Sequence, residues 1–202
     1  MPGQNLTRDE ARQRAATITT ASYDVDLDLT GGPETFHSRT TVRFAAQPGA
    51  ETFIDLIADA VAEITLNGRS VDVGAFADSR IVLTDLAADN ELTVDATCRY
   101  TNTGEGLHRF VDPADGEVYL YSQFEVADSR RVFAVFEQPD LKATFAFTVT
   151  APAHWEVVTG QAGSRVESGH GVATWTFAPT ERISSYITAI VAGPYHRETA
   201  EL

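Results

Sequence analysis

The chain has 202 residues, of which 43% are hydrophobic, and its formal net charge is −14 at pH 7. This length and apolar fraction are typical of a folded domain and argue against wholesale disorder. Phosphate groups are bound by an excess of Lys and Arg, so the acidic balance argues against a nucleic-acid partner or an anionic membrane surface. We expect one domain that spans residues 1–202.

The N-terminal segment and the cysteine content bear on location. The first twenty residues contain no apolar core of a secretory signal, and no stretch approaches the ~18 apolar residues that span a membrane. Cys98 is the only cysteine, which rules out an intrachain disulfide and a cysteine-based metal site. It lies on the apolar face of "ELTVDATCRY", so we expect a buried, unreactive thiol. A cytoplasmic protein is the expectation.

One helix is predicted, near the N-terminus. In "TRDEARQRAATI", Thr7 and Glu10 have the spacing of a capping box. Ala11, Ala15 and Ile18 form a thin apolar stripe at helical spacing, which predicts a surface helix laid on a larger body.

From residue 21 the apolar period changes to two, which is typical of strands. The segments 22–30 and 35–45 flank the turn sequence "GGPE" and are predicted to form a hairpin. Their outward faces carry an acidic row and a basic row, which we expect to pair across the strands. Further short strands follow, among them two joined by an Asn67-Gly68 turn. The pattern predicts an all-β fold, a large curved antiparallel sheet or sandwich with one short helix.

Catalytic and metal-binding patterns are missing from the sequence. No histidine has a second histidine three to five residues away, so the helical zinc pair of a metallopeptidase is absent. No nucleophile elbow, phosphate-binding glycine loop or calcium-binding loop is present. We therefore predict no catalytic residue and no metal ligand in this chain.

The stretch "YLYSQFEVADSRRVF" holds the candidate site. Alternation along a strand places Gln123 and Glu125 on one face and Phe124 on the other. An amide oxygen beside a carboxylate suits a small cation such as an ammonium group. The same pair also fits the polar rim of an ordinary sheet, held by Arg130 or Arg131.

The residues around this stretch resemble a signature of the zinc aminopeptidase N family. The matching segments are Gly106 to Arg109, Ser122 to Glu125, Ser129 to Phe133, Phe136 to Pro139, and Lys142 to Phe145. The end of the chain, "FAPTERISSYITAIVAGPY", is similar to a strand of the family too. Departures are His108 for a frequent tyrosine, Ala134 for proline, and Glu137-Gln138 for Asp-Glu.

The resemblance implies a β-rich, saddle-like N-terminal domain of a longer enzyme. By this resemblance, Gln123 and Glu125 would hold the free α-amine of a peptide substrate. Zinc and its ligands would lie in a catalytic domain absent from this chain, which would be inactive alone. Arg130 and Arg131 would form ion pairs that hold the fold, with Glu137 or Asp140 as candidate partners. The expected partners are peptides, through their N-terminal amine, and the enzyme's own catalytic domain.

Two other hypotheses are also compatible with the sequence. One is a non-catalytic interaction or scaffold module homologous to that domain, and the other is an unrelated β-sandwich binding domain. The retained Gln123 and Glu125 favour the aminopeptidase reading, because a scaffold has no need of a site for an ammonium group.

Overall fold

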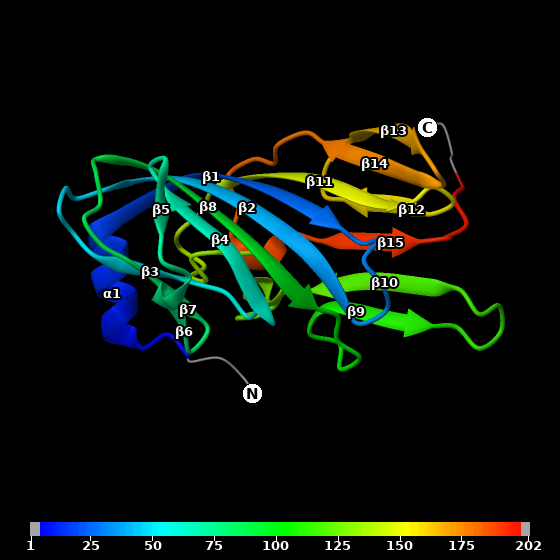
Figure 1. Ribbon diagram of the computed structural model, residues 1–202, viewed down its shortest axis with the longest axis horizontal. Helices are drawn as coiled ribbons and strands as arrows, with labels where there is room; N and C mark the ends of the chain where they lie inside the picture. Colours follow the sequence, from blue (N-terminus) through cyan, green and yellow to red (C-terminus); the bar gives the residue numbers. More distant parts are fainter. Residues whose placement is uncertain (1–4, 199–202) are drawn as a thin grey trace.

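The computed structural model describes residues 5–198, so the predicted domain 1–202 extends beyond it at both ends. Three β-sheets make up most of the described chain (Figure 1). The large sheet contains, in spatial order, β13 (Gly163–Gly169), β14 (Val172–Phe177), β11 (Thr144–Pro152), β1 (Ile18–Asp28), β2 (Thr35–Ala46), β8 (Asp89–Arg99), β4 (Ala60–Leu66) and β5 (Arg69–Val71). The all-β prediction is confirmed.

Two smaller sheets accompany the large one. The four-stranded sheet has the order β12 (Glu156–Thr159), β15 (Ile190–Gly193), β10 (Val118–Gln123) and β9 (Gly106–Val111). The three-stranded sheet has the order β3 (Thr52–Asp55), β7 (Arg80–Leu83) and β6 (Phe76–Ala77). In the described part of the chain, three short 3-10 helices lie in the connections: η1 (Val73–Ala75), η2 (Ser129–Arg131) and η3 (Ser185–Ile187). One continuous hydrophobic cluster joins side chains from all three sheets.

The predicted hairpin is confirmed as β1 and β2, which pair antiparallel along their length. Period-two burial follows from the pleat, with Tyr23, Val25 and Leu27 buried on the inward face. The other neighbour of β1 is β11, and that pair is parallel. The sheet is therefore mixed. The sequence did not indicate this, because alternation shows which face of a strand is buried but not the direction of the neighbouring strand.

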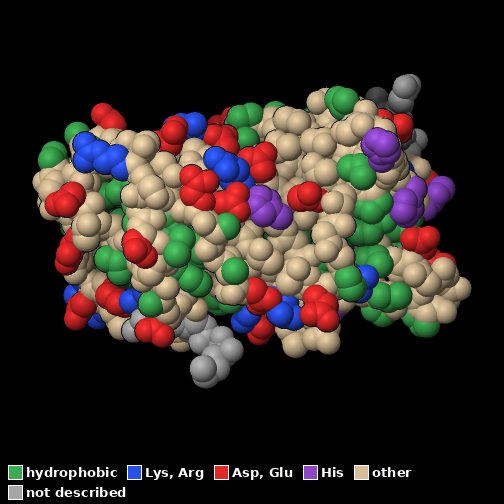
Figure 2. All heavy atoms as spheres, viewed as in Figure 1, with side chains coloured by type: hydrophobic (Ala, Val, Ile, Leu, Met, Phe, Trp, Pro, Cys, Tyr) green, Lys and Arg blue, Asp and Glu red, His purple; other side chains and the backbone are tan. Residues whose placement is uncertain are grey.

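The charged rows pair differently from the expectation. Arg43 does bond Asp24 across the hairpin, and it also lies 3.0 Å from Glu91 on β8. His37 and Arg39, in contrast, both meet Asp95 of β8, at 2.7 and 3.6 Å. β8 lies on the other side of β2, so the basic row is shared between two acidic neighbours. Figure 2 shows acidic, basic and histidine side chains intermixed on this face.

Two local predictions from turn and core chemistry are confirmed. Asn67 and Gly68 have φ values of 53° and 74°, the positive pair that a tight two-residue hairpin needs between β4 and β5. Cys98 is fully buried, and loss of hydration raises the pKa of its thiol to about 12. The thiol is therefore protonated and unreactive at neutral pH.

The predicted helix is α1 (Arg8–Thr17), and its capping box is present. Thr7 Oγ1 accepts from the Glu10 backbone N–H, and the Glu10 carboxylate accepts from the Thr7 backbone N–H at 2.8 Å. The predicted apolar stripe is wrong within the helix, because Ala15 is exposed and the residue that α1 buries is Arg14.

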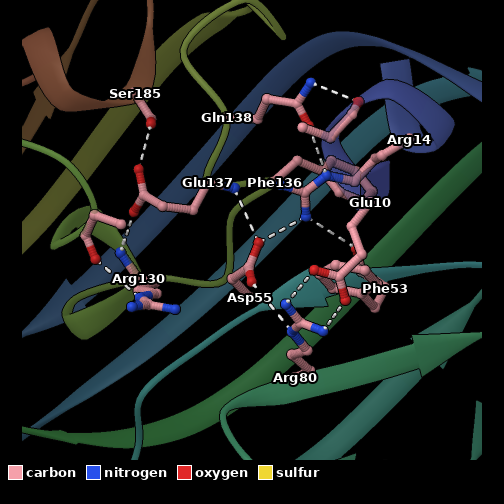
Figure 3. A network of polar contacts seen from close by, with 12 residues as sticks. Glu10, Arg14, Phe53, Asp55, Arg80, Arg130, Phe136, Glu137, Gln138 and Ser185 are labelled. Atoms are coloured by element: carbon pink, nitrogen blue, oxygen red, sulfur yellow. Dashed lines mark hydrogen bonds and ion pairs between the residues drawn. The ribbon is translucent and has the colours of Figure 1, made fainter. Parts of the chain in front are cut away.

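A buried ionic network attaches α1 to the body of the protein. Arg14 Nη1 lies 2.7 Å from Asp55 Oδ2, and Arg14 Nε donates to Gln138 Oε1 at 3.0 Å. The guanidinium groups of Arg14 and Arg80 both lie over the ring of Phe53, at 4.8 and 4.0 Å from its centroid. Figure 3 shows these side chains converging from the helix, the three-stranded sheet and the segment around Gln138. A charged contact therefore takes the place of the expected apolar one.

Candidate functional site

The candidate site lies where β10 ends. β10 pairs with β9 so that Gln123 stands opposite Gly106. The strand stops at Gln123, and Glu125 begins the turn 125–128. Phe124 between them is 2% exposed and packs edge-on against Phe133, at 5.8 Å between ring centroids. The buried ring therefore fixes the point from which the two polar residues project.

Both predicted site residues are exposed and lie next to each other. Gln123 Oε1 accepts a hydrogen bond from the Glu125 backbone N–H at 2.7 Å. This bond orients the Gln123 amide along the turn and leaves its oxygen one further lone pair. The Glu125 carboxylate has neither a hydrogen bond nor an ion pair with any residue between 5 and 198. An exposed carboxylate, on the residue whose backbone N–H orients a nearby amide oxygen, can accept charge-assisted hydrogen bonds from a cation.

The two arginines that follow the turn hold it in place. Arg130 Nε donates to the Ala127 carbonyl oxygen at 2.9 Å. Arg131 lies 2.6 Å from Asp128 and 3.0 Å from Glu105. The prediction that arginines hold the fold fits these contacts, but the partners of Arg131 are not the expected Glu137 or Asp140.

Glu137 does meet Arg130, through the backbone rather than through a salt bridge. Its carboxylate accepts from the Arg130 backbone N–H at 2.9 Å and from the Ser129 hydroxyl. Its other oxygen accepts from the Ser185 hydroxyl at 3.0 Å (Figure 3). Burial raises the pKa of Glu137, and these hydrogen bonds act in the opposite direction. The residue therefore ties η2, directly after the turn, to η3 near the end of the chain.

His108 lies on β9 next to the site. Its ring stacks on Tyr121, with the centroids 4.7 Å apart, and its Nδ1 accepts from the Gly104 backbone N–H at 3.0 Å. That bond holds the loop before β9 and uses the nitrogen lone pair. Within residues 5–198, no group of three or more His, Cys, Asp and Glu side chains is arranged to hold a metal ion.

The sequence pointed to Gln123 and Glu125 as candidate site residues but not to the side chains that support them. Asp128 and Glu105 carry no signal of their own in the sequence, since each is one acidic residue among 29. Asp55 and Arg14 are 41 residues apart, and nothing in either segment points to the other. Glu105 and Asp55 become recognisable as partners of Arg131 and Arg14 only when the fold brings distant segments together, whereas Asp128 lies three residues before Arg131.

Comparisons with known proteins agree with the resemblance. The family model described as the peptidase M1 N-terminal domain matches residues 19–187. The chain is 58% identical over 201 residues to "Aminopeptidase N" of Streptomyces lividans, covering 97% of this chain and 23% of that protein. It is 27% identical over 188 residues to "Probable M1 family aminopeptidase 1" of Encephalitozoon cuniculi, covering 80% of this chain and 21% of the relative. The chain thus spans less than a quarter of the length of these relatives.

Proposed function

Because the chain belongs to the peptidase M1 N-terminal domain family, we propose that it is the substrate-anchoring part of a longer aminopeptidase. The full-length enzyme removes N-terminal residues from peptides, and this part binds the free α-amine. The observation that carries the proposal is the pair Gln123 and Glu125, exposed side by side with the carboxylate unpaired within the described residues.

The physical case rests on charge and desolvation. An α-ammonium group donates to the Glu125 carboxylate and to the remaining lone pair of Gln123 Oε1, and such charge-assisted bonds are stronger than neutral ones. An internal peptide segment offers no ammonium group, so it would leave the carboxylate desolvated and unpaired. Such a site rejects the wrong substrate more strongly than it favours the right one. The pair therefore makes the enzyme selective for chain ends.

Zinc and a cytoplasmic location belong to the same proposal. The described residues of this chain do not fit a metal site. We therefore assign zinc, which would polarise the peptide carbonyl and activate water, to residues outside this chain. Within residues 5–198 no helix is long and apolar enough to cross a membrane. The lone, buried Cys98 is compatible with a reducing compartment.

The test is Glu125→Gln in the full-length enzyme. Losing a charge-assisted hydrogen bond, worth about 1.5–3 kcal/mol, should lower kcat/KM for an aminoacyl substrate by about 10- to 150-fold. Gln123→Ala should have a smaller effect, because the amide is a neutral acceptor. Steady-state kinetics measure both changes.

The control is thermal unfolding of the chain itself. Glu125 is exposed and its carboxylate holds no other described residue, so Glu125→Gln should change the free energy of unfolding by less than about 0.5 kcal/mol. Full activity of the variant, or unfolding of the chain when Glu125 is replaced, would show that the residue is structural.

A further inference from the structure

The turn that carries Glu125 is linked to β9 by one side chain. Arg131 extends from η2, and its Nε donates to Asp128 Oδ1 at 2.6 Å. Asp128 closes the turn 125–128, while Arg131 Nη2 reaches Glu105 Oε2, 3.0 Å away, in the residue just before β9. The side chains of Arg131 and Asp128 are each about one-fifth exposed, so their contact is largely shielded from water, whereas Glu105 is half exposed.

The stem of the same side chain lies against the partner of Gln123. Gly106 has a φ of +61°, and a Cβ placed on it would come within 2.8 Å of Arg131 Cβ and 3.0 Å of its Cδ. Only a glycine leaves room for the arginine there. Because Gly106 pairs with Gln123, Arg131 touches the strand pair that presents Gln123 as well as the turn that presents Glu125.

The charges are arranged so that Arg131 leaves Glu125 unpaired. Two carboxylates, Asp128 and Glu105, surround its guanidinium. The Glu125 carboxylate, six residues before Arg131, has no ion pair among the described residues. A guanidinium without its own partners would attract the nearest free carboxylate. The two acidic residues therefore keep the cation engaged and leave the negative charge of Glu125 for an external ammonium group.

We propose that Arg131 is a positioning residue for amine recognition, which fixes the turn carrying Glu125 against the strand pair carrying Gln123. This inference rests on the proposed function of the two anchoring residues. Arg131 does not itself touch the substrate. It sets the separation and direction of two side chains that bind one ammonium group, and such a two-point contact is sensitive to small displacements.

The experiment compares two ligands of the full-length enzyme carrying Arg131→Met. Methionine keeps an unbranched stem over Gly106 but removes both ion pairs. One ligand is a competitive inhibitor with a free α-amine, and the other is the same molecule with the amine replaced by hydrogen. We expect Kd for the amine ligand to rise about tenfold, as a misplacement of less than roughly 1 Å would produce. Kd for the ligand without the amine should change less than about twofold, because that ligand does not use the site.

Three further variants complete the test. Glu105→Gln removes one of the two ion pairs of Arg131 and should produce a smaller, selective loss of amine binding. Arg131→Lys keeps the charge and should restore part of the lost selectivity. Arg43→Met is the matched control, because Arg43 also bonds two carboxylates but lies on β2 in the large sheet. It should leave both Kd values unchanged.

The outcomes separate this inference from the proposed function. The preference for the amine ligand is the ratio of the two Kd values. If Glu125→Gln lowers this preference while Arg131→Met and Glu105→Gln leave it unchanged, the positioning role is overturned and the proposed function stands. Equal weakening of both ligands by Arg131→Met would reveal a merely structural residue. If Glu125→Gln itself leaves the selectivity unchanged, the proposed function fails. If Arg131→Met does not fold, the same comparison of Kd for the two ligands is made with Glu105→Gln and Arg131→Lys, and their result decides the question.

Discussion

At the scale of single residues, a buried ion pair attaches α1 to the rest of the protein, where an apolar contact is usual. Arg14 and Asp55 are 1% exposed and lie 2.7 Å apart. Asp55 also accepts from the Glu137 backbone N–H at 3.2 Å. Removing two charges from water is costly, and the attraction between them repays this only with good geometry and further hydrogen bonds. Breaking one side of such a pair leaves an uncompensated charge inside the protein.

We therefore expect Arg14→Met to lower the free energy of unfolding by about 3–5 kcal/mol, because Asp55 loses its closest cation. Urea unfolding of the chain measures the change. Arg12→Met is the matched control on the same helix, since Arg12 is exposed and lies 3.8 Å from exposed Asp9. That variant should cost less than about 0.5 kcal/mol. Equal effects of the two substitutions would contradict the structural role of the buried pair.

At the scale of elements, α1 shows how a short, polar helix is held. Glu10 closes the capping box with Thr7, and it also meets Arg80 of β7 at 2.6 Å. The hydrogen bond from Arg80, followed by the one from the Thr7 backbone, lowers the pKa of Glu10 from 4.5 to about 2. One carboxylate therefore stabilises the helix terminus and also attaches it to the three-stranded sheet.

This pKa shift predicts how stability depends on pH. A carboxyl group whose pKa is lower in the folded state stabilises the fold above its unfolded pKa, and this contribution is lost as pH falls through the folded pKa. Glu10→Gln should lower Tm near neutral pH, and the difference from the unsubstituted chain should shrink below about pH 4.5 and vanish near pH 2. Thermal unfolding across this pH range measures it.

The control for this prediction is Glu34→Gln. Glu34 is a well-exposed glutamate that lies 3.3 Å from Arg99. An exposed pair of this kind contributes little, so the substitution should change Tm only slightly at every pH. A Tm difference for Glu10→Gln that stayed constant down to pH 2 would show that the carboxylate charge is not responsible.

At the scale of the whole molecule, the sheets provide a rigid support for a small polar site. The turn 125–128 follows β10 directly, and Phe124 anchors its start in the common hydrophobic cluster. Glu137 then ties the segment after the turn to η3. Sites held on packed strands keep their geometry better than sites on free loops. In our proposal, Gln123 and Glu125 supply binding groups, whereas the bond-breaking chemistry belongs to another part of the enzyme.

The purified, tag-free chain should accordingly bind no stoichiometric zinc and should not hydrolyse an aminoacyl chromogenic substrate. The physical reason is that the described residues bring no three metal-ligating side chains together. Elemental analysis and a turnover assay check the two statements, with the full-length enzyme as the positive control. One equivalent of zinc in the chain would contradict the assignment of the metal to residues elsewhere.

Features that depend on neighbours along the chain could be predicted from the sequence. Period-two alternation predicted β1 and β2, Asn67-Gly68 predicted a tight turn, and Thr7 with Glu10 predicted the start of α1. These succeed because pleat, turn conformation and capping are set within a few residues. Gln123 and Glu125 are exposed on either side of buried Phe124, but Glu125 lies in the turn after β10 and not on the strand face that alternation predicted.

Contacts between groups far apart in the sequence could be identified only in the folded protein. In the folded protein β11 lies parallel to β1, His37 pairs with Asp95, and Arg14 is buried against Asp55. Alternation in a strand leaves the direction and identity of its neighbours open. A charged residue likewise does not specify which of many opposite charges it will contact, because Coulomb attraction depends on distance in space and not on position in the sequence. Arg131 reaches Glu105 because η2 packs against β9, whereas Asp128 lies only three residues before Arg131 in the chain.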